Sequence, residues 1–165
     1  MMNRRILVAG VGNIFLGDDA FGVEVAQRLA KSKLPDNVHV VDFGIRSYDL
    51  AYALMEDWEL VILVDAITKG DVPGTLYTME PELPDTGDEC AAFDAHTLNP
   101  VSVLQLVNAL GGEVGRMLVV GCEPASVDAD ALGNIGLSPA VNAAVDEAVQ
   151  LVNELVSRNS PARAA

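Results

Sequence analysis

Three short runs of aliphatic residues constrain the fold of this chain more than any other feature. They lie at residues 5–10, 59–65 and 116–122, within a chain that is half apolar and only 5% aromatic. Near-continuous aliphatic strands are typical of a parallel sheet that is covered on both faces. Alternating or apolar segments predict two further strands at 38–42 and 75–79. Helical spacing predicts helices at 20–31 and 47–55, one that ends near residue 110, and a last one in which Ser138 is the N-cap and Pro139 the first residue. The pattern therefore predicts an α/β fold with a central sheet between two helical layers.

The length and composition of the chain are those of one folded unit. One hundred and sixty-five residues are enough to bury a substantial core, and 21% charged residues is too few for a disordered chain. The sequence shows no internal repeat and no linker that would divide it. We predict a single α/β domain at residues 1–158, followed by a frayed tail at residues 159–165.

The balance of charge argues against several classes of partner. The formal net charge is −14, from 24 acidic and 10 basic residues, so the surface repels phosphate backbones and anionic membranes. We expect neither nucleic acid nor a membrane as a partner. The apolar stretch after Arg4 and Arg5 is too short for a signal peptide or a membrane helix, which predicts a cytoplasmic protein. Its two cysteines, Cys90 and Cys122, lack CxxC spacing and are expected to be free thiols.

Two adjacent carboxylates follow the first strand in a glycine-rich turn. The turn runs from Gly10 to Gly22 and contains Asp18 and Asp19 just before the predicted helix. An acid at this place can cap the helix and meet the positive end of its dipole. Because a helix needs only one cap, we expect one of the two carboxylates to cap it and the other to be free for another role.

Two further ligand-type side chains follow at other predicted strand or helix ends. Asp65 ends an aliphatic run, where burial of an unpaired charge is costly, so it needs either backbone N–H groups or a cation as partner. His96 is predicted to open the helix that ends near residue 110; a lone histidine there is commonly a surface or capping residue. Because ligands bind at the carboxyl ends of strands in α/β folds, the free acid of the Asp18-Asp19 pair, Asp65 and His96 together would suit nickel, zinc or a similar divalent ion.

Other motifs point to two weaker alternatives. Gly10 and Gly12 match the start of a dinucleotide-binding fingerprint, but Phe15 stands where its third glycine belongs. A thiol–imidazole pair of Cys90 or Cys122 with His96 lacks a recognisable cysteine-protease context. No HExxH motif and no G-x-S-x-G nucleophile elbow is present.

Four segments resemble the [NiFe]-hydrogenase maturation endopeptidases. They are the opening residues 6–23, Val64-Asp65-Ala66, Pro73-Gly74-Thr75 and residues 135–141, with His96 in its expected place between the last two. The resemblance implies an α/β/α sandwich with a mixed, mostly parallel five-stranded sheet. It also implies a cytoplasmic endopeptidase that removes the C-terminal extension of the hydrogenase large-subunit precursor after nickel insertion.

The resemblance assigns the family's metal-binding and catalytic positions to Asp19, Asp65 and His96. Nickel would be supplied by the precursor, and zinc or cadmium could occupy the same site. The first of these ligands is often Glu in the family, and Asp42-Phe43-Gly44-Ile45 replaces the common Asp-Gly-Gly-Thr. A non-proteolytic nickel carrier or precursor-binding chaperone would use the same three ligands and stays open as an alternative. Release of the precursor after one cleavage would suit a monomer.

Overall fold

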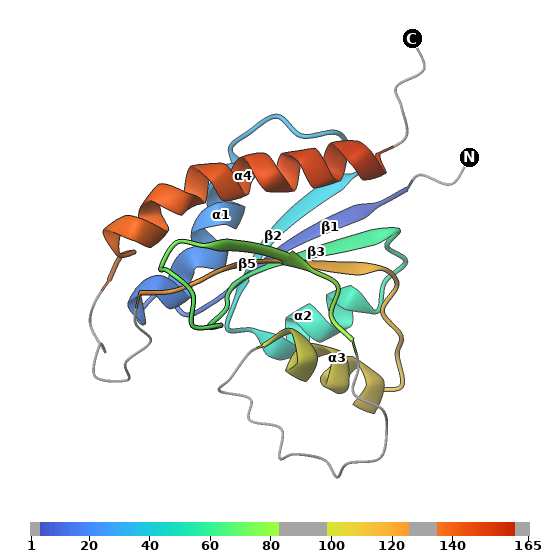
Figure 1. Ribbon diagram of the computed structural model, residues 1–165. Helices are drawn as coiled ribbons and strands as arrows, with labels where there is room; N and C mark the ends of the chain where they lie inside the picture. Colours follow the sequence, from blue (N-terminus) through green and yellow to red (C-terminus); the bar gives the residue numbers. More distant parts are fainter. Residues whose placement is uncertain (1–3, 83–98, 126–134, 161–165) are drawn as a thin grey trace.

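A computed structural model describes residues 4–82, 99–125 and 135–160 of the chain. The strands alternate with helices for the first half of the chain, as the aliphatic runs predict (Figure 1). In chain order the elements are β1 (Ile6–Val11), the 3₁₀ helix η1 (Gly17–Ala20), α1 (Phe21–Ala30), β2 (Val38–Gly44), α2 (Ser47–Leu54), β3 (Leu60–Ala66), β4 (Leu76–Met79), α3 (Pro100–Ala109), β5 (Met117–Cys122) and α4 (Pro139–Asn159).

The strands form one five-stranded sheet in the order β2-β1-β3-β5-β4. β1 pairs in parallel with β2 and β3, and β3 pairs in parallel with β5, whereas β4 runs antiparallel to β5 at the edge. This confirms a mixed, mostly parallel sheet. The carboxyl ends of β1, β2, β3 and β5 consequently lie at the same end of the molecule.

Each face of the sheet has its own apolar core. Successive residues of a strand point to opposite faces, and in β3 Ile62 and Val64 pack with α1 and α4 while Val61 and Leu63 pack with α2 and α3. Figure 1 shows α1 and α4 above the sheet and α2 and α3 below it. The three-layer α/β/α sandwich is therefore confirmed, and the alternation places Asp65 on the same face as Leu63, toward α2 and α3.

Two element boundaries differ from the predicted ones. The helix predicted from residue 20 starts with the separate 3₁₀ turn of η1, and α1 follows at Phe21. The helix predicted to open at His96 begins at Pro100, because the side chain of Asn99 accepts the N–H of Ser102 at 2.9 Å and so caps it. His96 lies outside the described residues.

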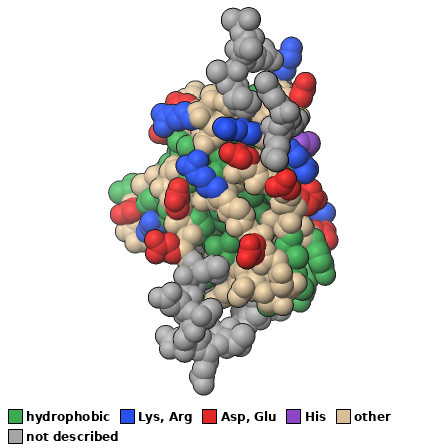
Figure 2. Space-filling model, turned by 90° about the vertical axis from the view of Figure 1, so that its right-hand side faces the viewer, with side chains coloured by type: hydrophobic (Ala, Val, Ile, Leu, Met, Phe, Trp, Pro, Cys, Tyr) green, Lys and Arg blue, Asp and Glu red, His purple; other side chains and the backbone are tan. Residues whose placement is uncertain are grey.

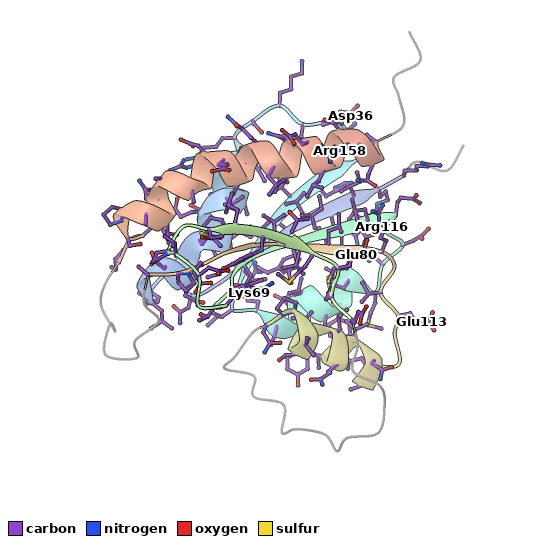
Figure 3. All side chains as sticks on the ribbon, viewed as in Figure 1. Asp36, Lys69, Glu80, Glu113, Arg116 and Arg158 are labelled. Carbon is purple, nitrogen blue, oxygen red and sulfur yellow. The ribbon has the colours of Figure 1, made fainter. Side chains whose placement is uncertain are left out.

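Basic residues gather at the end of the molecule where the strands begin. Figure 2 looks onto this end and shows Lys and Arg side chains mixed with Asp and Glu. Figure 3 places Arg116 and Arg158 there, with Glu80 beside Arg116 at 3.7 Å, while Lys69 lies toward the opposite end. Within the described ranges, no helix combines the length and apolar character needed to cross a membrane.

Candidate active site

A tight turn after β1 fixes the position of Asp19. The backbone N–H of Leu16 donates to the carbonyl of Asn13 at 3.1 Å, and the N–H of Asp19 donates to the carbonyl of Leu16 at 3.2 Å. The Asp19 carboxylate then accepts the backbone N–H of Asn13 at 2.8 Å. These hydrogen bonds fix the turn and the Asp19 carboxylate relative to one another, so Asp19 is oriented before any ligand binds.

Two glycines let this turn lie close to the sheet. Gly12 has a φ of +146°, and a side chain on it would collide with the carbonyl of Asp19. A side chain on Gly22, in the first turn of α1, would collide with the carbonyls of Val11 and Val64. Both glycines therefore have a packing role, because they allow η1 and α1 to sit directly over the ends of β1 and β3.

Asp18 has a structural role that differs from the predicted one. It is 4% exposed and accepts three hydrogen bonds, from the N–H of Ala125 at 2.8 Å, the N–H of Ser138 at 2.7 Å and the hydroxyl of Ser138 at 2.9 Å. Neither η1 nor α1 has a side-chain cap, so the expectation that one of the two acids caps this helix is wrong. Ser138 is the N-cap residue of α4, but its hydroxyl donates to Asp18 in place of capping the helix.

Asp65 lies at the end of β3, in the middle of the sheet. Its neighbour across the ladder is Gly121 of β5, and its side chain is 3% exposed. Burial raises the pKa of Asp65 well above its ordinary value, and the charge of Asp19 raises it further, while a hydrogen bond from the N–H of Ala66 acts in the opposite direction. The backbone donor therefore does not compensate for the loss of water around this carboxyl.

Asp19 and Asp65 form an acidic pair. Although they are far apart along the chain, η1, which carries Asp19, packs against β3, which carries Asp65, and the charge of Asp19 raises the pKa of Asp65. Burial also raises the pKa of Asp19, against the opposing hydrogen bond from Asn13. Across the described ranges neither carboxylate forms an ion pair with Lys or Arg. A buried and a half-buried acid that lack a basic partner suit a cation, since a cation would remove both the desolvation cost and the repulsion.

A third buried carboxylate at the strand ends was not singled out from the sequence. Glu123 follows β5, is 3% exposed and accepts the N–H of Lys69 at 2.7 Å, the N–H of Gly70 at 3.0 Å and the hydroxyl of Tyr77 at 2.7 Å. The hydrogen bond from Tyr77, with those from the backbone, lowers the pKa of Glu123. Glu123 therefore fastens the loop between β3 and β4 to β5. An acid directly after an aliphatic strand was the sequence signal for it, as it was for Asp65.

Of the remaining predicted site residues, Cys122 is the one that the structure describes. His96 and Cys90 lie outside the described residues, and the part of the chain that is described holds no group of three His, Cys, Asp or Glu side chains that could bind a metal. Cys122 is a buried free cysteine, as expected. Burial, followed by the charges of Asp18 and Glu123, raises the pKa of Cys122 to about 12, which leaves it a thiol and argues against a nucleophilic role.

The fold and the acidic pair define a class of protein: an α/β/α sandwich with two interacting carboxyls near the strand ends. Sequence comparison then identifies the family. The family model described as hydrogenase maturation protease matches residues 23–155. Hydrogenase 2 maturation protease of Escherichia coli is 31% identical over 90% of this chain and 88% of its own length. The hydrogenase expression/formation protein HupD of Rhodobacter capsulatus is 33% identical over 92% of this chain and 71% of its own length.

A solved structure agrees with this result. The hydrogenase-maturating endopeptidase HybD of Escherichia coli superposes with a TM-score of 0.71, at 29% identity, over 93% of both chains. The chain belongs to the hydrogenase maturation protease family, and its membership makes it a peptidase. The resemblance seen in the sequence is therefore confirmed.

Proposed function

We propose that this protein is the endopeptidase that removes the C-terminal extension of a [NiFe]-hydrogenase large-subunit precursor, and that it recognises nickel already bound by the precursor. Asp19, Asp65 and His96 would contact that nickel ion as part of the substrate. The cleavage would take place in the cytoplasm.

The acidic pair is the observation that carries the proposal. Of the four acids described for this site, Asp18 and Glu123 are each satisfied by three hydrogen bonds. Asp19 and Asp65 instead have raised pKa values and repel each other. A divalent ion presented by the precursor would stabilise these two carboxyls in their charged forms.

His96 is proposed as the third contact because of the direction from which α3 enters the fold. α3 begins at Pro100 on the side where the strands end (Figure 1), and it covers the sheet face to which Asp65 belongs. An imidazole beside two carboxylates gives the mixed nitrogen and oxygen donor set that nickel and zinc accept.

The chemical contribution of the site would come mainly from positioning. Asp19 is held by the turn after β1 and Asp65 by the central strand of the sheet, so both would meet the precursor with little rearrangement. A bound divalent ion supplies Lewis acidity, which polarises a peptide carbonyl or acidifies a water molecule. The two carboxyls would hold that ion and its attached precursor segment in register with the bond that is cut.

A precursor-processing assay with purified components tests the proposal. Asp19→Ala, Asp65→Ala and His96→Ala should each abolish cleavage of nickel-loaded precursor, and Glu82→Ala, a change at an exposed acid, should leave it intact. Circular dichroism of each variant checks that the fold is retained. Cleavage by any of the three folded site variants at the wild-type rate would refute the assigned role of that residue.

Two further measurements separate the proposal from its alternatives. Precursor without nickel should stay uncut, and equal cleavage with and without nickel would refute recognition of the metal. Mass spectrometry of the precursor after incubation distinguishes a peptidase from a nickel carrier or chaperone, since only a peptidase lowers the precursor mass.

A further inference from the structure

An apolar groove lies next to the acidic pair. It is formed by the loop after β1 and the loop after β2, and it encloses about 360 Å³. Val23 and Phe43 lie buried beneath it, and Ile14, Phe15 and Ile45 form its exposed rim. The groove joins the acidic pair through Asn13, which lines it and donates its N–H to Asp19.

The rim brings three exposed large apolar side chains together. Ile14 is 49% exposed, Phe15 56% and Ile45 63%. Single exposed apolar residues are common on protein surfaces, but a contiguous group around a hollow marks a binding site. Because the exposed group borders the acidic pair, the position of the groove suits the substrate of this peptidase.

The walls of the groove are fixed by hydrogen bonds. The N–H of Gly12 donates to the carbonyl of Gly44 at 3.0 Å, and so joins the two loops. The Arg46 guanidinium donates to the carbonyl of Phe43 at 3.2 Å and pairs with Asp49 at 3.4 Å. A site that is formed before binding loses little conformational entropy when it is filled, which favours affinity for a flexible partner segment.

The size and charge of the groove indicate its occupant. A volume of about 360 Å³ is at the lower end of the range for small-ligand pockets and suits one or two amino-acid side chains better than a large cofactor. A second copy of this chain would carry the same net charge of −14, and an anionic lipid surface would be repelled as well. The groove itself is lined by one acid, Asp42, and one base, Arg46, so its lining carries no net charge. An extended, uncharged segment of another polypeptide fits both the apolar rim and this balance of charge.

We infer that the groove binds a bulky apolar side chain of the hydrogenase precursor, in the segment next to the bond that is cut. This inference rests on the proposed function. The groove is a specificity site: it fixes the register of the precursor relative to Asp19 and Asp65, and its residues do not touch the reacting atoms. Apolar anchors that fill a pocket contribute a large share of the binding energy in protein interfaces.

Steady-state cleavage of nickel-loaded precursor tests the inference. Ile45→Asp and Phe15→Asp should each raise KM about tenfold or more with kcat at saturation unchanged, as expected for loss of binding that is equal in the ground and transition states. The conservative substitution Ile45→Val, which keeps an apolar rim, should leave KM at the wild-type value. Val72→Asp is the matched control, because Val72 is 76% exposed and lies outside the groove; its KM should not change.

The outcomes separate this inference from the proposed function. If wild-type protein cleaves the precursor and the two groove variants cleave it with wild-type KM, the groove inference is refuted and the proposed function stands. If the wild-type protein does not cleave the precursor, the proposed function itself fails. An equal rise of KM in Val72→Asp would also refute the inference, because it would show a general effect of added negative charge.

Two measurements identify the occupant directly. Benzoylphenylalanine in place of Phe15 should form a photo-crosslink to the precursor, and mass spectrometry should locate it in the segment that flanks the cleaved bond. A crosslink elsewhere in the precursor would overturn the inference. Sedimentation velocity should show the same mass for wild type and Ile45→Asp; a wild-type dimer that Ile45→Asp dissociates would assign the groove to a second copy of the chain.

Discussion

Two adjacent acids have different roles in this structure, one in stability and the other in activity. Substitution of each acid tests this assignment. Asp18 is buried and accepts three hydrogen bonds that fasten η1 to the start of α4 and to the loop after β5. Asp19 accepts one backbone hydrogen bond and faces the candidate site. We therefore expect Asp18→Ala to reduce stability, and Asp19→Asn to abolish activity with little change in stability.

The expected loss for Asp18→Ala follows from its three partners. A hydrogen bond to a charged group contributes about 1.5–3 kcal/mol, and a buried donor that loses its partner adds a desolvation cost. Water can replace the carboxylate at Ala125, which is exposed, so most of the loss comes from the N–H and hydroxyl of Ser138. We expect the free energy of unfolding to fall by about 3 kcal/mol, or the Tm by about 6–12 °C for a chain of this length.

Urea denaturation measures this difference. Trp58 is the single tryptophan and is buried, with its indole N–H donating to the carbonyl of Ala53 at 2.7 Å, so its fluorescence reports unfolding. Ser138→Ala removes only the hydroxyl partner and should cost about 1 kcal/mol. A loss below about 1 kcal/mol in Asp18→Ala would refute the structural role of Asp18. Destabilisation of Asp19→Asn to the same extent as Asp18→Ala would refute the division of roles.

Three further predictions concern buried groups near the site. Asp65→Asn should make the metal-free protein more stable at neutral pH, because burial raises the pKa of Asp65 above its unfolded value of 3.8 and so penalises the charged form. The gain in stability should vanish near pH 3.8, where the unfolded chain also becomes protonated. A series of urea denaturations across pH measures this. Glu123 has a lowered pKa, so its contribution to stability is present above pH 4.5 and is lost as the pH falls through its folded value; Glu123→Gln should weaken the acid-induced loss of stability in thermal melts. Gly22→Ala should destabilise the fold by about 1–3 kcal/mol in urea, because its new Cβ would collide with backbone carbonyls of β1 and β3, and a neutral effect would contradict the packing described here.

The aliphatic runs were sufficient to predict the layers and most of the strands. β1, β3 and β5 are buried along their length, and such strands can only lie inside a covered sheet. The resemblance implied a mixed sheet, but not that β4 is its antiparallel strand, and the alternation of residues 75–79 is the same in either direction. α3 begins at Pro100 and not at the predicted His96, because the side chain of Asn99 caps it.

The sequence predicted that acids lie at this end of the sheet, but it did not single out Glu123 and did not predict which acids are satisfied by hydrogen bonds. Asp18 and Glu123 depend on hydrogen-bond donors that lie far away in the sequence, such as Ser138 and Tyr77. No local sequence pattern predicts those partners. The apolar groove was missed for the same reason, because Phe15 and Ile45 come from loops that only the parallel pairing of β1 and β2 brings together.

The division of work between Asp18 and Asp19 has a simple geometric cause. Both residues lie in η1, and a 3₁₀ helix has three residues per turn, so neighbouring side chains point about 120° apart. One carboxylate is thereby directed to α4, where Ser138 and Ala125 satisfy it, and the other to the end of β3, where it interacts with Asp65. Adjacent positions in this one short turn thus let an Asp-Asp pair anchor the fold with one carboxylate and leave the other available to a cation.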